Sequence, residues 1–155
     1  DNRTTAQFWR GSFDPIISFL EEGGSTIISP ARYYYVNMAY HTISLNEAYQ
    51  YEPLPIDISK RFKENILGIE AELWGEVIKS EEKAEYCAFP RVLAIAETAW
   101  TQPEHKNLKR ILKSIKQFEP ILEKMNIKYT SLKEANPSGL RTFINRWKKG
   151  FGAYL

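Results

Sequence analysis

Three short apolar segments, each followed by a stretch of helical character, do most to constrain the fold of this 155-residue chain. They cover residues 6–10, 25–29 and 66–71, and the second, Ser-Thr-Ile-Ile-Ser, is rich in β-branched side chains. Short strands that alternate with helices are typical of parallel βα units. Three parallel strands cannot close a barrel and would leave unpaired edges. We therefore expect an α/β fold in which the chain is the C-terminal piece of a larger barrel, with the missing strands before Asp1.

Apolar periodicity and proline positions predict the helices. The first is expected over residues 16–22, with Ser12 and Asp14 as its cap and Pro15 in its first turn. Three more are expected over residues 58–65, over 81–100 with a start or kink at Pro90, and over 108–125 with a kink or restart at Pro120. The expected buried side chains of the helix over 81–100 are Val92, Leu93, Ile95, Ala96 and Ala99.

Two parts of the chain lack such a pattern. Residues 41–57 are polar and contain two prolines, which predicts an irregular loop. After Tyr129 the periodicity weakens, and a last helix is expected to carry Phe143 and Trp147 with several solvated basic residues. We therefore divide the chain into a barrel segment, residues 1–129, and a C-terminal helical tail, residues 130–155.

The composition argues against several classes of partner and site. Lys and Arg number 21 against 19 Asp and Glu, so the formal charge of +2 gives no field that favours nucleic acid. A run of about 20 apolar residues, the length of a membrane span, is missing. Cys87 is the single cysteine, and His41 and His105 lack further ligands at metal-binding spacing. We expect no metal, no cofactor, no nucleic-acid partner and no membrane span.

Trp9, Tyr35 and Trp74 occupy the same relative place, at or just after a strand, and Glu76 follows Trp74 by two residues. In a parallel α/β fold such positions meet at the carboxyl ends of the strands, where ligands bind. An aromatic pocket with a few acids suits a sugar, because its C–H faces pack on rings while its hydroxyls need directed acceptors. A core position for Trp74 is the alternative. No pair of carboxylates is expected at a strand end.

Four segments then follow one another along the chain in a specific combination. They are Trp9-Arg10 after a strand, Tyr35-Val36-Asn37-Met38, Leu73-Trp74-Gly75-Glu76, and the helix that begins with Phe89-Pro90-Arg91. Together they resemble glycoside hydrolase family 20, the β-N-acetylhexosaminidases, from about Thr5 to Tyr129. The resemblance implies a (β/α)₈ barrel, of which this chain would be roughly strands six to eight. It also implies a retaining mechanism in which the substrate's own acetamide attacks the anomeric carbon.

The resemblance further implies roles for five residues. Trp9 and Trp74 would wall the sugar ring and its acetamide, and Tyr35 would be catalytic by donating its hydroxyl to the acetamide oxygen. Glu76 would accept from sugar hydroxyls. Asn37 stands where the family usually has an aspartate, which removes a charge-assisted acceptor near the C4 or C6 hydroxyl. The family's catalytic Asp-Glu pair has no match in residues 1–155, so the chain alone is expected to be inactive.

Arg91, Glu97 and Trp100 match structural helix positions of the family. The expected partners are a carbohydrate with a terminal N-acetylhexosamine and the N-terminal remainder of the same barrel. Two alternatives stay open, a non-catalytic carbohydrate-binding protein on a degenerate barrel and a disaccharide-releasing enzyme of the same family. The resemblance is compatible with a secreted, periplasmic or lysosome-like compartment, which the single cysteine does not fix.

Overall fold

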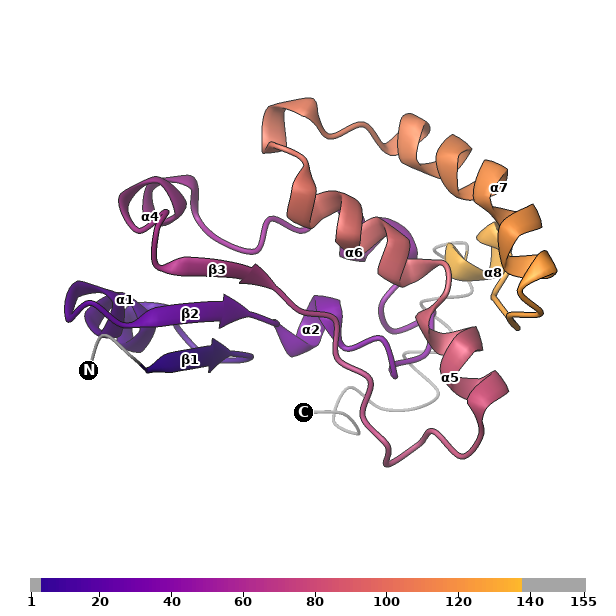
Figure 1. Ribbon diagram of the computed structural model, residues 1–155, viewed down its shortest axis with the longest axis horizontal. Helices are drawn as coiled ribbons and strands as arrows, with labels where there is room; N and C mark the ends of the chain where they lie inside the picture. The colour runs from indigo at the N-terminus through magenta and orange to yellow at the C-terminus, as the bar shows by residue number, and fades with distance from the viewer. Residues whose placement is uncertain (1–3, 138–155) are drawn as a thin grey trace.

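The fold is built on a parallel three-stranded sheet in the computed structural model, which describes residues 4–137. The strands are β1 (Thr5–Phe8), β2 (Ser25–Ile28) and β3 (Ile66–Ile69), in the spatial order β1-β2-β3. The three predicted strands are therefore confirmed, and each ends one or two residues earlier than expected. All three run in the same direction, so their carboxyl ends lie along one edge (Figure 1).

Two helices, α1 (Asp14–Glu21) and α4 (Ile56–Arg61), contribute to an apolar cluster on one face of the sheet. Its buried members are Phe8, Ile16, Leu20, Ile28 and Phe62. Because side chains alternate between the two faces of a strand, neighbouring residues such as Gln7 and Leu67 are exposed instead. The sheet thus has one covered face and one that is open in the described part of the chain.

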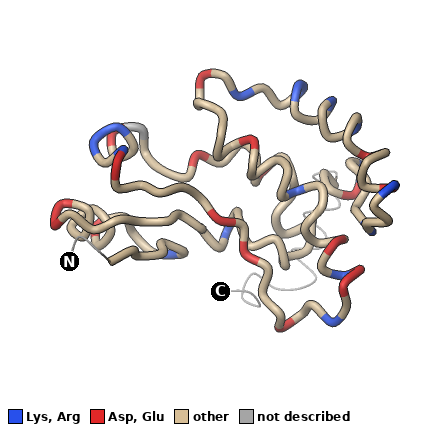
Figure 2. The backbone as a smooth tube through the Cα atoms, in the orientation of Figure 1, with Lys and Arg blue, Asp and Glu red and all other residues tan. Residues whose placement is uncertain are grey.

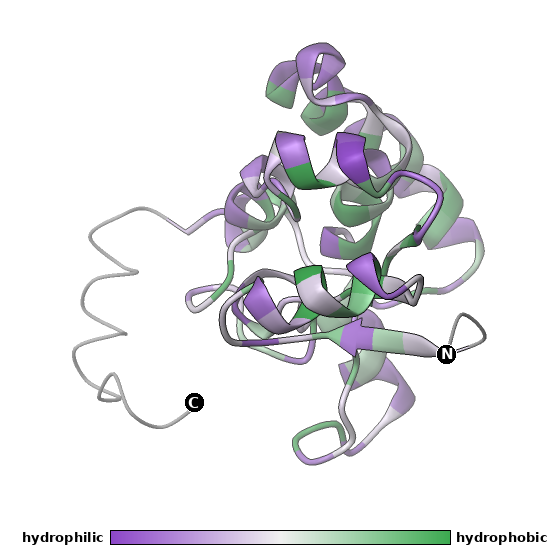
Figure 3. Cartoon of the chain, turned by 90° about the vertical axis from the view of Figure 1, so that its left-hand side faces the viewer, coloured by the Kyte–Doolittle hydropathy of each residue, from purple (hydrophilic) through white to green (hydrophobic). Residues whose placement is uncertain are grey.

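The remaining helices form a second group beyond the tips of the strands, with α2 (Ala31–Tyr34) leading into it from β2 (Figure 1). The group consists of α3 (Leu45–Gln50), α5 (Glu81–Ala88), α6 (Arg91–Trp100), α7 (Leu108–Lys124) and α8 (Leu132–Ala135). Hydrophobic and hydrophilic stretches alternate along these helices, as expected when one face of each is buried (Figure 3). Their shared core comprises Tyr40, Leu45, Tyr49, Ala94, Ile111, Ile115 and Ala135.

The predicted loop over residues 41–57 is wrong in its middle, where α3 forms. Ser44 caps this helix with a reciprocal capping box: its hydroxyl accepts from the Glu47 N–H, and the Glu47 carboxylate accepts from the Ser44 N–H. The Ser-x-x-Glu signature was present in the sequence. By contrast, the expected Ser12 and Asp14 cap of α1 does not form, because Phe13 is the first flanking residue and no side chain caps the helix.

The helix predicted over residues 81–100 is two helices, α5 and α6, that are separated at Phe89 and Pro90. Proline has no N–H and disfavours helical backbone in the residue before it, and Phe89 is accordingly extended. The buried face of α6 also differs from the prediction, since it consists of Arg91, Ala94, Ile95 and Thr98. Arg91 and Thr98 are buried, whereas the expected Ala96 and Ala99 are exposed. The two polar side chains can be buried because they donate hydrogen bonds to the backbone carbonyls of Val36 and Tyr49.

The predicted helix over residues 108–125 is confirmed as α7, and it does not restart at Pro120, because the helix continues through the proline without a break. Pro120 and Lys116 are both exposed, so water can satisfy the Lys116 carbonyl that the proline leaves without a donor. The predicted helix with Phe143 and Trp147 lies outside the described residues. Among the described helices, none has the length and apolar character that crossing a membrane requires.

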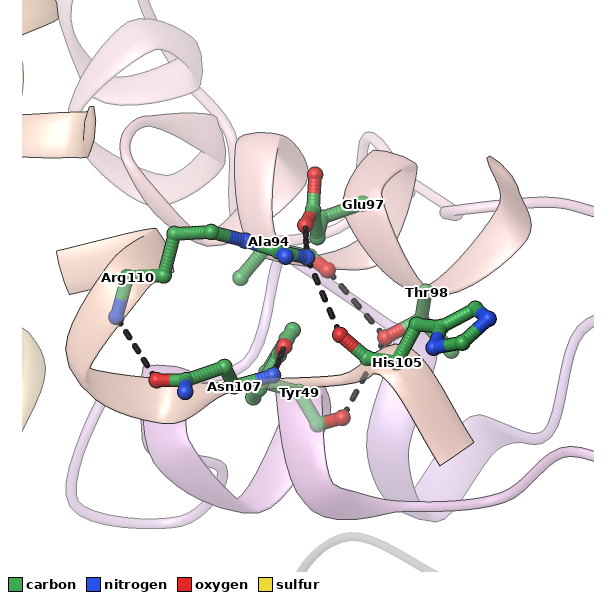
Figure 4. A network of polar contacts seen from close by, with 7 residues as sticks. All are labelled: Tyr49, Ala94, Glu97, Thr98, His105, Asn107 and Arg110. Carbon is green, nitrogen blue, oxygen red and sulfur yellow. Dashed lines mark hydrogen bonds and ion pairs between the residues drawn. The ribbon is translucent and has the colours of Figure 1, made fainter. Parts of the chain in front are cut away.

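Polar contacts tie α3, α6 and α7 together away from the sheet (Figure 4). The Thr98 hydroxyl donates to the carbonyl of Tyr49 at 3.2 Å, and the Tyr49 hydroxyl accepts from the backbone N–H of Asn107 at 2.7 Å. Arg110 donates to the Glu97 carboxylate at 2.9 Å and to the carbonyl of His105, in the 3₁₀ turn Pro103–His105, at 3.1 Å. These contacts fix the helical group on which one wall of the site described next is mounted.

Candidate functional site

A cavity of about 680 Å³ lies at the carboxyl ends of the strands. Its wall is formed by the connections that follow β1, β2 and β3, which the parallel topology brings to one edge. All five side chains that the sequence singled out line it: Trp9, Tyr35, Asn37, Trp74 and Glu76. The remaining lining residues are Gln7, Met38, Ala39, His41, Thr42, Val77 and Lys83.

Three aromatic rings line this cavity, and the Tyr35 ring lies close to each of the two indoles. The Trp9 and Tyr35 ring centroids lie 6.4 Å apart, and those of Tyr35 and Trp74 lie 5.9 Å apart. Arg10 packs its guanidinium 4.4 Å from the centre of the Trp9 ring. The exposed fractions of Trp9 and Trp74, 41% and 44%, exclude a core position for either ring in the described part of the chain. Half-exposed tryptophans that face a cavity are available as apolar walls for a ligand.

Tyr35 is held by an extension of the sheet beyond its regular strands. The Val36 N–H donates to the carbonyl of Glu72 at 2.8 Å, and the Glu72 N–H donates to the carbonyl of Tyr34 at 2.9 Å. Burial raises the pKa of Tyr35 above its usual value, the hydrogen bond with Trp74 lowers it, and the nearby Glu72 charge raises it. The phenol therefore stays protonated and available as a donor at neutral pH.

Asn37 and Glu76 both line the cavity, and their polar atoms differ in exposure. The Asn37 Oδ1 atom is buried and has no hydrogen-bond partner among residues 4–137. The Glu76 side chain is exposed, and its charge acts on the phenol of Tyr35. A ligand hydroxyl can donate to an exposed carboxylate of this kind.

A pair of carboxylates does lie at a strand end, which corrects the sequence-based expectation. Acidic positions follow the tip of β3 (Figure 2), and there Glu70 and Glu72 both accept from the side-chain amide of Gln7, at 2.8 and 2.5 Å. Burial, followed by the charge of Glu70, raises the pKa of Glu72. The signal was the Glu-x-Glu spacing, because residues two apart on extended backbone point to the same side.

Sequence reasoning missed the rim of the cavity, to which His41, Thr42, Val77 and Lys83 contribute. None of them carries a recognisable motif, and the path of two irregular connections brings them to the site.

The three residues expected at structural helix positions differ in their surroundings. Arg91 is fully buried and Glu97 pairs with Arg110, but Trp100 is 91% exposed. No group of three or more His, Cys, Asp or Glu side chains suited to a metal ion occurs within residues 4–137.

The arrangement suits a neutral ligand that has both apolar faces and hydroxyl groups. Two half-exposed indoles can pack against apolar C–H faces, and a protonated phenol lies between them as a hydrogen-bond donor. An amide and a carboxylate supply further polar contacts from two different connections. Groups of these kinds are suited to binding and polarising a ligand.

Comparisons with known proteins agree with this picture. The family model described as "Glycosyl hydrolase family 20, catalytic domain" matches residues 1–103. A β-N-acetylhexosaminidase of Cellulomonas fimi is 25% identical over 139 residues, which are 81% of this chain and 28% of that protein. A β-hexosaminidase of Porphyromonas gingivalis is 31% identical over 100 residues, covering 64% of this chain and 13% of that protein. The chain therefore spans less than a third of the length of either relative.

Solved structures show the same similarity in three dimensions. The crystal structure of a GH20 exo β-N-acetylglucosaminidase from Vibrio harveyi, in complex with N-acetylglucosamine, superposes with a TM-score of 0.75 at 26% identity. The superposition covers 86% of this chain and 23% of that one. Over most of its length the chain thus has the α/β fold of these enzymes.

Proposed function

This chain belongs to glycosyl hydrolase family 20, and we propose that the protein of which it is part is a β-N-acetylhexosaminidase. It would remove terminal β-linked N-acetylglucosamine or N-acetylgalactosamine from a carbohydrate. The observation that carries the proposal is that Trp9, Tyr35, Trp74 and Glu76 line the same cavity at the strand ends. The names of the relatives, β-N-acetylhexosaminidase and β-hexosaminidase, support it.

The chain would supply roughly strands six to eight of a (β/α)₈ barrel, together with their helices. Two observations support this placement. The strands are parallel and in sequential order, and the face that carries Gln7 and the 59%-exposed Leu67 is open in the described residues. In a closed barrel that face would point to the interior, where the N-terminal remainder of the same barrel would cover it.

In the proposed reaction, the acetamide oxygen of the substrate attacks its own anomeric carbon while the bond to the leaving oxygen breaks. The leaving oxygen takes its proton from a carboxylic acid in the rest of the barrel, and water then opens the oxazolinium intermediate with retention of configuration. The Tyr35 hydroxyl would donate a hydrogen bond to the acetamide oxygen, and its raised pKa keeps that hydroxyl protonated at neutral pH. Trp9 and Trp74 would restrict the acetamide to the attacking pose.

One observation favours a second candidate, a non-catalytic carbohydrate-binding protein. Asn37 replaces the aspartate that the family usually has, so the cavity lacks one charge-assisted acceptor. Such a protein would bind N-acetylhexosamine without cleaving it. A disaccharide-releasing enzyme would instead cleave, and the length of its product distinguishes it from an enzyme that removes single sugars.

An assay of the parent protein on an aryl β-N-acetylglucosaminide tests the proposal. Tyr35→Phe is expected to lower kcat about 100-fold by removing one donor to the developing charge. Trp74→Ala is expected to lower kcat/KM by removing an aromatic wall. Trp100→Ala is the matched control, because that indole is 91% exposed and is not part of the cavity wall. Unchanged kcat/KM in both cavity variants would contradict the assignment, and binding without hydrolysis by the wild type would favour the second candidate.

A further inference from the structure

Residues 35–43, which we call the wall segment, form one side of the cavity. The segment contains Tyr35 and Asn37 and also supplies four of the rim and wall residues, Met38, Ala39, His41 and Thr42. It contains no regular helix or strand, so its shape depends on contacts with the rest of the chain. Three of its carbonyl oxygens accept hydrogen bonds from one side chain, Arg91 of α6.

The Arg91 guanidinium lies behind the wall segment and is fully buried. Its Nη1 donates to the carbonyl of Ile43 at 2.5 Å, and its Nη2 donates to the carbonyls of Val36 at 2.8 Å and Met38 at 2.7 Å. Nη2 also donates to the carbonyl of Cys87 in α5 at 3.1 Å. The ring of Tyr40, itself in the wall segment, lies 4.2 Å from the guanidinium carbon. The side chain thus joins the wall segment to two helices.

None of these partners is a carboxylate, which makes the arrangement unusual. Removing a cation from water is costly, and burial lowers the pKa of Arg91 accordingly. An apolar side chain would fill the same volume without that cost. Only a multivalent donor, however, can satisfy several carbonyls that converge from a segment without its own backbone pairing. We therefore attribute the presence of a buried cation here to the carbonyls of the wall segment that it satisfies, and not to the packing of the core.

The geometry around Asn37 is the most specific part of this contact. The carbonyls that Nη2 holds belong to Val36 and Met38, the residues on either side of Asn37. The Asn37 Oδ1 atom has no partner among the described residues, so no hydrogen bond of its own fixes that end of the amide. The direction of the Asn37 side chain therefore depends on the backbone on both sides of it. One nitrogen atom, Nη2 of Arg91, holds the two carbonyls of that backbone, and the Val36 N–H is held separately by the carbonyl of Glu72.

We propose that Arg91 is a positioning residue for sugar recognition: by holding the carbonyls on both sides of Asn37, it fixes how the Asn37 amide meets a hydroxyl group of the ligand. The inference rests on the proposed function for the identity of the ligand, an N-acetylhexosamine. It assigns no chemistry to Arg91 itself, which does not line the cavity. Arg91 would therefore govern affinity and hydroxyl preference rather than the rate of bond cleavage.

A double-mutant cycle in the parent protein tests this role. Arg91→Lys keeps the charge but loses the fork that reaches several carbonyls, and it is expected to raise KM for an aryl β-N-acetylglucosaminide about 5- to 10-fold, with kcat within about 2-fold. In an Asn37→Ala background the same change is expected to alter KM less than about 2-fold, because the amide that Arg91 positions is absent. Arg110→Lys is the matched control, since Arg110 also donates to a backbone carbonyl but does not line the cavity.

Each outcome of the cycle decides the matter. An equal rise in KM with and without Asn37, or no rise at all, overturns the inference while leaving the proposed function intact. A parent protein that binds N-acetylglucosamine without hydrolysis contradicts the proposed enzymatic activity but not the role of Arg91. The same double-mutant cycle is then measured as Kd values, from the fluorescence of the cavity tryptophans. A parent that neither cleaves nor binds this sugar overturns both. Where circular dichroism shows Arg91→Lys to be unfolded, Tyr40→Leu, which removes the ring against the guanidinium, replaces it in the cycle with the same expected coupling to Asn37.

Discussion

Tyr35 and Glu72 form an isolated parallel bridge beyond the ends of β2 and β3. The bridge continues the pairing of two strands into the wall of the cavity, so the position of a phenol that lines the cavity depends on sheet hydrogen bonds. The same Glu72 contributes its side chain to the carboxylate pair on Gln7. Backbone and side chain of one residue therefore serve two different parts of the site.

The raised pKa of Glu72 predicts a pH dependence of stability. A carboxyl whose pKa is higher in the folded than in the unfolded state contributes stability below its unfolded pKa, and loses it as pH rises through the folded pKa. Glu72→Gln removes the ionisation that causes this loss of stability, and its amide oxygen can still accept the hydrogen bond from Gln7. The Tm of the variant minus that of the wild-type parent is expected to be larger at pH 8 than at pH 4. Glu104→Gln, at an exposed site, controls for the loss of one charge. A difference that does not vary with pH would contradict the prediction.

Asn37→Asp is expected to change the preference between gluco and galacto substrates. A carboxylate accepts more strongly from a hydroxyl than an amide does, by about a factor of two in hydrogen-bond strength. The measurement is the ratio of kcat/KM for aryl β-N-acetylglucosaminide and β-N-acetylgalactosaminide in the parent protein, and a shift of about 10-fold is expected for one charge-assisted contact. If the ratio does not move, Asn37 does not contact the hydroxyl that distinguishes the two sugars.

The capping box of α3 is expected to contribute measurably to stability. Ser44→Ala removes the acceptor of the Glu47 N–H and is expected to cost about 1 kcal/mol, read as a lower Tm of the parent protein. Because α3 packs on α6, the loss should reach the helix that carries Arg91. Ser18→Ala, at an exposed position inside α1, is the control and is expected to be neutral or slightly stabilising. Equal Tm values for the two variants would show that the cap is unimportant.

Gly68 and Gly75 form a natural pair for testing backbone strain. A Cβ at either position meets no atom of the described chain within 4 Å, but only Gly68, at the register shift between β2 and β3, has a positive φ, 149°. Gly68→Ala is therefore expected to destabilise the parent protein by about 1–3 kcal/mol, while Gly75→Ala is close to neutral. Chemical denaturation of both variants provides the comparison, and an equal effect would point to crowding from the rest of the barrel instead.

The sequence predicted the features that depend on local pattern. Short apolar runs, one of them rich in β-branched residues, located the strands, and three-to-four-residue periodicity located α7. The placement of Trp9, Tyr35 and Trp74 after strands was enough to bring them to one cavity, because parallel topology aligns strand ends. The Ser-x-x-Glu cap of α3 was equally local and could have been found.

Other features depend on contacts between segments that are far apart in the sequence, and no local pattern predicts them. The buried face of α6 was mispredicted because apolar periodicity gives no weight to an arginine or a threonine, although both find carbonyls 48 or more residues away. The carboxylate pair at Glu70 and Glu72 was overlooked because its shared partner, Gln7, lies more than 60 residues earlier in the chain. Lys83 reaches the cavity only through the course of the connection before α5.

The contact of Gln7 with Glu70 and Glu72 joins β1 to the end of β3 and passes over β2 between them. The contact has its native geometry only where all three strands are paired in register, because Gln7 lies in β1 while Glu70 and Glu72 follow β3. The side-chain amide of Gln7, which nuclear magnetic resonance observes directly, is accordingly a spectroscopic reporter of a completed sheet.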